Sequence, residues 1–373
     1  MKKRDFLKSS AALASMVMMS IIYMGCKNDL NYDSNYTKPN AEVIAYYSGD
    51  DSLINEYNLN GVSQLIYSFL HLKGNNLAID NEKDSITLMN LTRLKEKHPE
   101  LKVLISLGGW GGCKTCSDVF STENGRKDFA NSTAEIIKSY NADGIDLDWE
   151  YPAISGFPNH TFKSQDKDNF TLLIQELRNV MNSDDILSFA AGGFPKYLEQ
   201  SIDWQKVMPL VNHVNIMSYD LYSTVKTGHH TPLYSNDSES YSADSSVKYL
   251  LSIGVPSNQI VIGGGFYGRI WENVPDINNG LFQVGNFKTT ISHRYINNLE
   301  DGYEFYWDET ANATYGYNKG SGNFISIDNA KSVLKKTEYV LDNDLKGIMF
   351  WELVNDDPKN SLLKIMVDTV LGK

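Results

Sequence analysis

The chain has 373 residues, of which 34 are Lys or Arg and 46 are Asp or Glu, for a formal net charge of −12. Nucleic acids and anionic partners attract basic proteins, so this balance argues against either as a partner. Hydrophobic residues make up 42% of the chain, which is ample for a large core. The length allows two or three domains, but a single α/β barrel often uses 250 residues or more.

The first 26 residues are predicted to be an export signal. A basic start at residues 2–4 leads into an apolar run over 11–24, which is too short for a convincing membrane span. The Gly-Cys ending resembles a bacterial lipoprotein cleavage site, so we expect Cys26 to be lipidated. Residues 3–8 also resemble a twin-arginine signal, although the first Arg is replaced by Lys.

Residues 27–40 are polar, rich in Asn and Asp, and are expected to form a tether. The folded domain is therefore predicted over 41–373. The only membrane attachment expected is the lipid at Cys26, which would place the domain at the periplasmic face or the cell surface. We expect a monomer.

Short apolar runs alternate with amphipathic segments along the rest of the chain. Strands are predicted at Val43–Tyr47, Gln64–Leu70, Val103–Ser106, Gly144–Glu150, Leu187–Ala191, His213–Tyr219, Ile260–Gly265 and Gly347–Glu352. Helices are predicted at Thr87–His98, Lys127–Tyr140, Lys167–Asn182, Asp203–Leu210, Ala243–Ile253, Asn329–Asp342 and Leu362–Leu371. This alternation predicts an α/β fold, a (β/α)8 TIM barrel with its function at the C-terminal ends of the strands.

The interval between the seventh and eighth strands is too long for one crossover helix. Within 269–328, the segments 303–307, 313–317 and 323–327 alternate as antiparallel strands do. We interpret the interval as a small α+β insertion on the functional face of the barrel. Loops of this length are usually functional, so it is expected to wall one side of a groove.

The fourth predicted strand carries Asp146, Asp148 and Glu150 on one face, because side chains on a strand alternate with period 2. Burying three neighbouring carboxylates is costly and pushes their pKa values apart, which suits acid chemistry. Two other interpretations remain open at this point. One is a solvated acidic face, and the other is a hard-metal site, although Ca²⁺ sites usually use a Gly-containing loop.

The octet Asp-Gly-Ile-Asp-Leu-Asp-Trp-Glu at 143–150 resembles the catalytic strand of glycoside hydrolase family 18, the chitinase family. The resemblance runs from about Glu42 to Asp357. It includes matching motifs at four further strand ends: Ser106–Trp110, Met217–Asp220, Tyr267–Arg269 and Phe350–Glu352.

The resemblance implies a substrate-assisted mechanism, in which the 2-acetamido group of the sugar supplies the nucleophile. Glu150 would be the general acid and then the base. Asp148 would accept the acetamide N–H, and Asp146 would position Asp148. Tyr219 would donate its hydroxyl to the acetamide oxygen. No cofactor and no metal are implied.

The resemblance also implies an aromatic groove. Trp351 would be the floor under the scissile sugar, although a buried barrel Trp is the alternative. Tyr46, Phe69 and Trp110 match groove positions of the family, and each could instead be a core residue.

Four further residues, Met217, Asp220, Tyr267 and Arg269, are expected to contact the substrate, although Arg269 could instead pair with an acid of the insertion. His229 and His230 have no neighbouring ligand pattern, so they are predicted to be loop scaffolding rather than metal ligands.

Cys113 and Cys116 could be a redox pair, half of a zinc site or a local disulfide. There is no second Cys pair, and an exported protein favours oxidation, so the disulfide is predicted.

The function expected from the resemblance is hydrolysis of β-1,4 linkages between N-acetylglucosamine units, with chitin or its oligosaccharides as the partner. Two alternatives stay open. An endo-β-N-acetylglucosaminidase that cuts N-glycan cores shares the acidic strand. A catalytically inactive chitin-binding lectin would typically lose the acid at Glu150, which this chain keeps.

Overall fold

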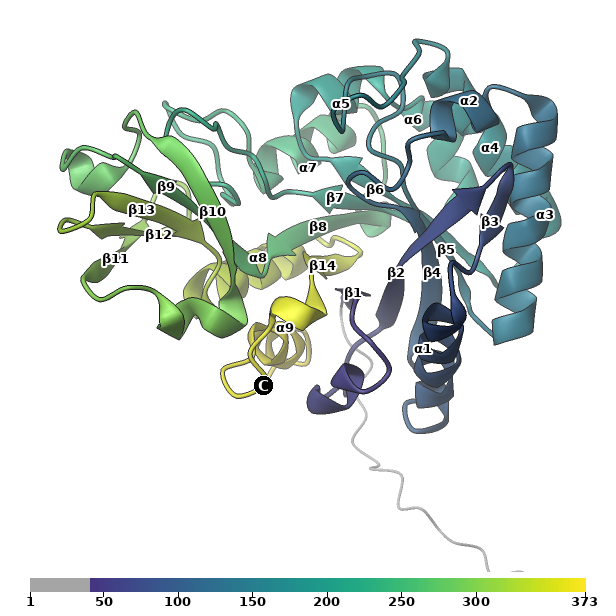
Figure 1. The fold of residues 1–373 in the computed structure, drawn as a ribbon, viewed down its shortest axis with the longest axis horizontal. Coiled ribbons are helices and arrows are strands. Elements are labelled where there is room, and N and C mark those ends of the chain that lie inside the picture. Colours follow the sequence, from purple (N-terminus) through teal and green to yellow (C-terminus); the bar gives the residue numbers. More distant parts are fainter. Residues whose placement is uncertain (1–40) are drawn as a thin grey trace, which may run out of the picture. The chain divides into compact units, whose positions relative to one another are not determined.

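The computed structural model describes residues 41–373, and the expectations for 1–40, including Cys26, lie outside the described residues. Eight parallel strands form a closed ring, in which β1 pairs with both β2 and β14 (Figure 1). This confirms the predicted (β/α)8 barrel. The barrel strands are β1 (Glu42–Tyr47), β2 (Gln64–Lys73), β4 (Lys102–Gly108), β5 (Gly144–Asp148), β6 (Ile186–Gly192), β7 (His213–Met217), β8 (Ile260–Gly265) and β14 (Gly347–Trp351), and the short β3 (Asn76–Ala78) pairs antiparallel with β2.

Helices cover the outside of the ring. They are α1 (Glu82–Arg93), α2 (Cys116–Phe120), α3 (Glu123–Tyr140), α4 (Asp166–Val180), α5 (Pro195–Gln200), α6 (Trp204–Val207), α7 (Ala243–Ser252), α8 (Ala330–Asp342) and α9 (Leu362–Val370). Short 3-10 segments lie at Leu53–Glu56, Leu94–Glu96, Met208–Leu210, Ser257–Gln259, Asn278–Gly280, His293–Asn298 and Leu353–Asn355. None of the helices in 41–373 is long and apolar enough to cross a membrane.

Two helices begin earlier than the apolar pattern predicts, because a polar side chain caps each of them. The Thr122 hydroxyl accepts a hydrogen bond from Gly125 N at 3.0 Å, which starts α3 at Glu123. Asn81 accepts from Asp84 N at 3.1 Å and starts α1 in the same way. Such caps contribute roughly 0.5–2 kcal/mol each.

Strand β5 and the turn after it present their two faces to different surroundings, as the period of 2 predicts. Ile145, Leu147 and Trp149 are buried on the outer, helix-covered side. The Trp149 ring lies 5.4 Å from Phe120 of α2 and 6.4 Å from Phe170 of α4. Full burial of such side chains contributes roughly 1.5–3 kcal/mol each, so this contact fixes the strand and turns its acidic face inward.

The insertion is a five-stranded antiparallel sheet beside the barrel (Figure 1). Its strands, in the order β10-β9-β13-β12-β11, are β10 (Asn286–Ser292), β9 (Tyr267–Glu272), β13 (Asn323–Ile327), β12 (Ala313–Asn318) and β11 (Tyr303–Asp308). It begins at Tyr267, slightly before the predicted boundary, because β9 follows β8 after a single residue. Its helical content is the two 3-10 segments 278–280 and 293–298.

A buried ion pair joins the end of the insertion to the barrel. Lys336 of α8 places its Nζ 2.7 and 2.6 Å from the two carboxylate oxygens of Asp328, and both side chains are almost fully buried. Asp328 also accepts a hydrogen bond from Gly265 N, at the end of β8, at 3.0 Å. The ion pair therefore fixes the point where the chain returns from the insertion to the barrel.

Candidate active site

Asp146 and Asp148 lie in β5, and Asp148 is the last residue of that strand. Glu150 lies just beyond its C-terminal end. Asp146, Asp148 and Glu150 are 0%, 4% and 9% exposed, which excludes a solvated acidic face. Nowhere in residues 41–373 do three or more His, Cys, Asp or Glu side chains form a group that could hold a metal ion.

Asp146 is held by three hydrogen bonds from other barrel strands. The Tyr46 hydroxyl donates to Oδ2 at 2.9 Å, while Ser188 Oγ and Asn215 Nδ2 donate to Oδ1 at 2.6 and 3.0 Å. Burial raises the pKa of Asp146, and these three hydrogen bonds act to lower it. The carboxylate is therefore anchored in one orientation inside the barrel.

Asp148 and Glu150 form a coupled pair of buried acids. Burial raises the pKa of Asp148 well above its usual range, and the charges of Glu150 and Asp146 raise it further. Burial also raises the pKa of Glu150 to about 7, although Tyr151 acts against that shift. Oδ1 of Asp148 is buried and accepts no hydrogen bond from any residue in 41–373. A buried carboxylate oxygen of this kind is suited to an N–H donor from a ligand.

Tyr219 follows the end of β7 and is 8% exposed. Burial raises the pKa of its hydroxyl well above 10, and the charges of Asp148 and Glu150 add to this effect. The phenol therefore keeps its proton at neutral pH and can donate a hydrogen bond. Its hydroxyl donates to Met349 Sδ at 3.9 Å.

Trp351 ends β14 and is partly buried at the mouth of the barrel. The ring of Phe69 stacks on it, with centroids 5.4 Å apart and an interplanar angle of 14°. A register irregularity in β2 between Tyr67 and Leu70 contains Phe69, and such bulges re-aim side chains next to sites. Tyr46 lies 5.9 Å from Trp351 but is only 2% exposed and packs in a core cluster, as the alternative of a core residue held.

Gly108, the last residue of β4, and Gly109 let the chain after β4 approach β5 closely. A Cβ at Gly108 would lie 2.3 Å from the backbone oxygen of Asp148, and one at Gly109 would lie 2.3 Å from the Phe69 ring. Gly109 N also donates to Asp148 O at 2.9 Å. Trp110 comes next and is 58% exposed.

Asp220 and Arg269 pair with each other across the mouth of the barrel. Arg269 Nε and Nη2 donate to the two carboxylate oxygens at 2.7 and 2.5 Å. Partial burial raises the pKa of Asp220, but His230 and Arg269 outweigh it and hold the value at about 2. The partner of Arg269 is thus an acid of the loop after β7 and not, as the alternative held, one from the insertion. Met217 and Tyr267 line the same mouth beside Tyr219.

Both histidines of the loop after β7 are buried and contact the insertion. His229 Nε2 lies 3.0 Å from Asp308 Oδ2. His230 donates its backbone N–H to Ser326 Oγ at 2.9 Å, and its Nε2 lies 3.0 Å from Tyr267 O. Through these contacts the two histidines hold the loop after β7 against the five-stranded sheet.

Cys113 and Cys116 form a disulfide, with Cα atoms 5.3 Å apart. Cys116 is the first residue of α2, so the bridge connects residues 108–115, called the Trp110 loop below, to the start of that helix.

Sequence reasoning missed several residues of the site. Asn215 and Ser188 hold Asp146, and Tyr151 and Phe157 contact Trp110. The period of 2 on β7 places Asn215 on the same face as Met217 and Tyr219, which is a signal that could have found it. Ser188 and Phe157 carry no such signal, because their neighbours are set by strand register and loop path.

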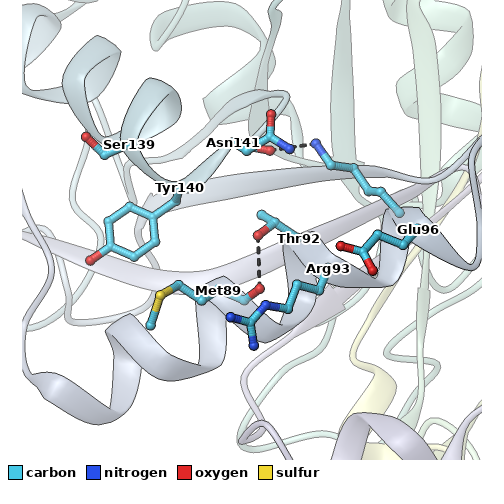
Figure 2. A pocket seen from close by; sticks show the side chains of 8 residues that line it. Met89, Thr92, Arg93, Glu96, Ser139, Tyr140 and Asn141 are labelled. Carbon is cyan, nitrogen blue, oxygen red and sulfur yellow. Dashed lines mark hydrogen bonds between the residues drawn. The ribbon is translucent and has the colours of Figure 1, made fainter.

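Two cavities differ in their relation to this site. One of about 400 Å³ borders Asp220 and continues between Phe194, Tyr222 and the 238–241 loop. The other, of about 420 Å³, lies between α1 and the end of α3, at the opposite end of the barrel strands (Figure 2). There Lys95 Nζ donates to Asn141 O at 2.5 Å. Thr92 Oγ1 donates to Met89 O at 3.1 Å (Figure 2). The second cavity therefore has no connection with the three buried acids.

Comparisons with known proteins agree with this geometry. A model described as "Glycosyl hydrolases family 18" matches residues 42–356. Chitinase A1 of Niallia circulans is 33% identical over 76% of this chain and 44% of its own length. Chitinase ChiW of Paenibacillus sp. str. FPU-7 has a TM-score of 0.82 at 31% identity, covering 88% of this chain and 43% of its own. A glycoside hydrolase family 18 N-acetylglucosaminidase from Paenibacillus barengoltzii has a TM-score of 0.80 at 31% identity, covering 88% of this chain and 99% of its own. The chain thus spans less than half the length of two of these three relatives.

Proposed function

Since the chain belongs to glycosyl hydrolase family 18, we propose that it is a retaining hydrolase of β-1,4 linkages between N-acetylglucosamine units, as in chitin or its oligosaccharides. The observation that carries the proposal is the buried carboxylate of Asp148, whose Oδ1 has no hydrogen-bond donor within 41–373. Asp148 lies between Asp146 and Glu150 in the alternating acidic run. An acetamide N–H supplies the missing donor.

In the proposed reaction, Glu150 transfers its proton to the glycosidic oxygen as the bond from that oxygen to the anomeric carbon breaks. The acetamide carbonyl oxygen of the same sugar attacks the anomeric carbon and forms an oxazolinium ion. Asp148 accepts the acetamide N–H and balances the positive charge. Tyr219 orients the acetamide by donating its hydroxyl to the carbonyl oxygen. Glu150 then removes a proton from the attacking water, and two successive inversions retain the anomeric configuration.

The residues around the three acids also suit an N-acetylglucosamine substrate. Trp351, with Phe69 stacked on it, offers an aromatic face beneath the sugar that is attacked. Arg269 and Asp220 present charged hydrogen-bonding groups at the rim, where sugar hydroxyls would meet them. Met217 and Tyr267 complete the wall.

The experiment is digestion of chitohexaose, with the product anomers followed by NMR, beside a cello-oligosaccharide of equal length. We expect products with retained β configuration and no cleavage of the sugar that lacks the acetamide. Inversion, or equal cleavage of the cello-oligosaccharide, would refute the proposal. A high-mannose glycopeptide tests cleavage of N-glycan cores, and binding of chitohexaose without cleavage would identify a lectin.

A second candidate is release of single terminal N-acetylglucosamine residues. It is favoured by the likeness to the N-acetylglucosaminidase from Paenibacillus barengoltzii, which is matched over 99% of its length. The early products separate the two activities. Monosaccharide alone from chitohexaose indicates the second, whereas disaccharides and longer products indicate the first.

We further propose that the protein is an exported, monomeric, chitin-binding lipoprotein with its lipid on Cys26, ahead of the polar tether 27–40. The support is the basic, apolar and Gly-Cys order of the first 26 residues. Radiolabelled palmitate should enter the wild-type chain but not C26A, and C26A should be recovered in the soluble fraction. Labelling of C26A would contradict the proposal. Sedimentation and a chitin pull-down test the remaining two points.

A further inference from the structure

We propose that the Cys113–Cys116 disulfide is a positioning element that holds Trp110 at the leaving-group side of the cleavage site and thereby sets affinity for the part of the substrate that departs. This inference rests on the proposed function and adds a specificity-determining element to it.

The Trp110 loop needs an external restraint, because its glycine-rich backbone has many accessible conformations. Four of its residues are glycines, and Gly108, Gly109 and Gly111 have φ values of 105°, 77° and 88°. Glycine loses more conformational freedom on ordering than other residues do. The Trp110 ring contributes little restraint of its own, since it is 58% exposed.

The loop is held at its start, middle and end. At the start, Gly109 N donates to Asp148 O at 2.9 Å. In the middle, Gly112 N donates to Gly109 O at 2.9 Å, which closes a turn around Trp110. At the end, Cys113 is bonded to Cys116, and its Cβ lies 3.6 Å from the position that a Cβ on Gly108 would take. The disulfide is the only covalent restraint of the three.

The far side of the disulfide is fixed to the barrel wall. Cys116 is fully buried at the start of α2. The next residue, Ser117, donates its hydroxyl to Asp166 Oδ1 of α4 at 2.9 Å. Lys163 Nζ lies 2.6 Å from Asp118 Oδ1. Because these contacts fix α2, the disulfide attaches the end of the Trp110 loop to a rigid part of the barrel.

The position of Trp110 identifies the substrate part that it would contact. Its ring lies 6.3 Å from Tyr151 and 5.5 Å from Phe157. Tyr151 directly follows Glu150, which gives its proton to the leaving group in the proposed reaction. The sugar that is attacked lies on Trp351 instead. An aromatic face at Trp110 is therefore suited to stack on a departing N-acetylglucosamine unit.

The test compares the full chain with C113A/C116A, in which apolar side chains occupy the same buried positions. Two substrates separate the roles: chitohexaose, which extends past Trp110, and β-chitobiosyl fluoride, whose fluoride leaving group does not. Ordering a side chain on binding lowers affinity, so we expect KM for chitohexaose to rise about 3- to 10-fold. The kcat and KM for the fluoride are expected to stay within about twofold, since its binding does not require Trp110.

W110A is the matched background. If the disulfide acts through Trp110, removing the disulfide from the W110A variant should change KM for chitohexaose less than twofold. Unchanged KM in the wild-type background, an equal KM increase for both substrates, or a full effect in W110A would each overturn the inference. If the wild-type protein cleaves neither substrate, the proposed function fails instead, so the two failures are distinguishable.

A second measurement covers poor folding of the double variant. Dithiothreitol reduces the S–S bond to two thiols and is itself oxidised to its cyclic disulfide, and mass spectrometry after alkylation reports the reduced fraction. The increase in KM for chitohexaose should scale with that fraction. An increase that does not scale with the reduced fraction contradicts the inference.

Discussion

The hydroxyl of Tyr46 donates a hydrogen bond to Oδ2 of Asp146, 2.9 Å away, across the interior of the barrel. The same hydroxyl accepts a hydrogen bond from Asn215 Nδ2 at 3.1 Å. Asn215 in turn donates to the other oxygen of Asp146 at 3.0 Å. Tyr46, Asn215 and Asp146 therefore form a closed triangle of hydrogen bonds inside the barrel, and none can be altered without affecting the other two.

The substitution Y46F removes one corner of this triangle. Asp146 loses a charge-assisted hydrogen bond, of a kind that contributes about 1.5–3 kcal/mol. If Asp146 positions Asp148 as the proposed mechanism requires, we expect kcat on chitohexaose to fall by roughly 10- to 100-fold. Y47F is the matched control. Tyr47 lies on the opposite face of the same strand, and its hydroxyl donates to Asp50 O. Equal kcat values for Y46F and the wild-type protein would exclude this role.

The substitution E150Q keeps the shape of the side chain and removes its transferable proton. General acid catalysis typically contributes 10²- to 10⁴-fold, so kcat should fall by at least about this factor. E338Q, on the outer surface of α8, should retain wild-type turnover. Normal turnover of chitohexaose by E150Q, measured beside its circular dichroism spectrum, would be incompatible with the assignment.

The pH dependence of cleavage follows from the raised pKa of Glu150. Because burial raises this pKa to about 7, the side chain carries its proton below that pH and loses it above. The value of kcat/KM should therefore fall about tenfold per pH unit above 7. A decline that begins near 4.5, the usual pKa of a glutamic acid, would mean that another group governs this limb.

The same shift predicts how stability depends on pH. Between about 4.5 and 7 the folded protein retains a proton at Glu150 that the unfolded chain releases, so this residue stabilises the fold less as the pH rises. The glutamine of E150Q does not ionise, so this variant does not lose stability in this way as the pH rises. Its gain in free energy of unfolding over the wild-type protein should grow through this window, to on the order of 3 kcal/mol at most, and stay constant above it. Urea denaturation at pH 4.5, 5.5, 7 and 8 measures this, and a gain that shrinks as the pH rises would contradict the sign.

The buried pair of Lys336 and Asp328 should matter for folding rather than for catalysis. K336M leaves Asp328 buried without its cation, which typically costs about 3–5 kcal/mol. The double variant K336M/D328N should recover much of this loss, since it buries no unpaired charge. K335M removes only an exposed pair with Glu338 and should change the free energy of unfolding by less than about 1 kcal/mol. Equal losses for K336M and K335M would refute this explanation.

The sequence predicted the barrel well, because each barrel strand is a short apolar run between turn residues. The acidic face was also predictable, since alternation with period 2 needs no knowledge of neighbouring strands. The ends were less accurate. The strands predicted to reach Glu150 and Tyr219 stop at Asp148 and Met217, so both functional side chains lie on the turns that follow.

Contacts between strands could not be predicted, because they depend on register. Asp146 is paired with Ser188 on β6, and this alignment brings the serine hydroxyl to the carboxylate. Nothing in the apolar pattern of either strand encodes that alignment. The pairing of Arg269 with Asp220 is similar, since the two residues are far apart in sequence and meet only when the insertion lies against the barrel.

The pairing of β1 with β14 has a consequence for biosynthesis. The first and last strands of the barrel are neighbours, so Val43 and Ile348 sit opposite each other although about 300 residues separate them. A nascent chain halted before β14 would carry seven barrel strands in an open sheet. In that sheet β1 and β8 would each have one unpaired edge, and such edges can pair with other chains. The barrel can therefore close only after β14 has been synthesised, and we expect a chain that terminates upstream of Gly347 to be prone to aggregation.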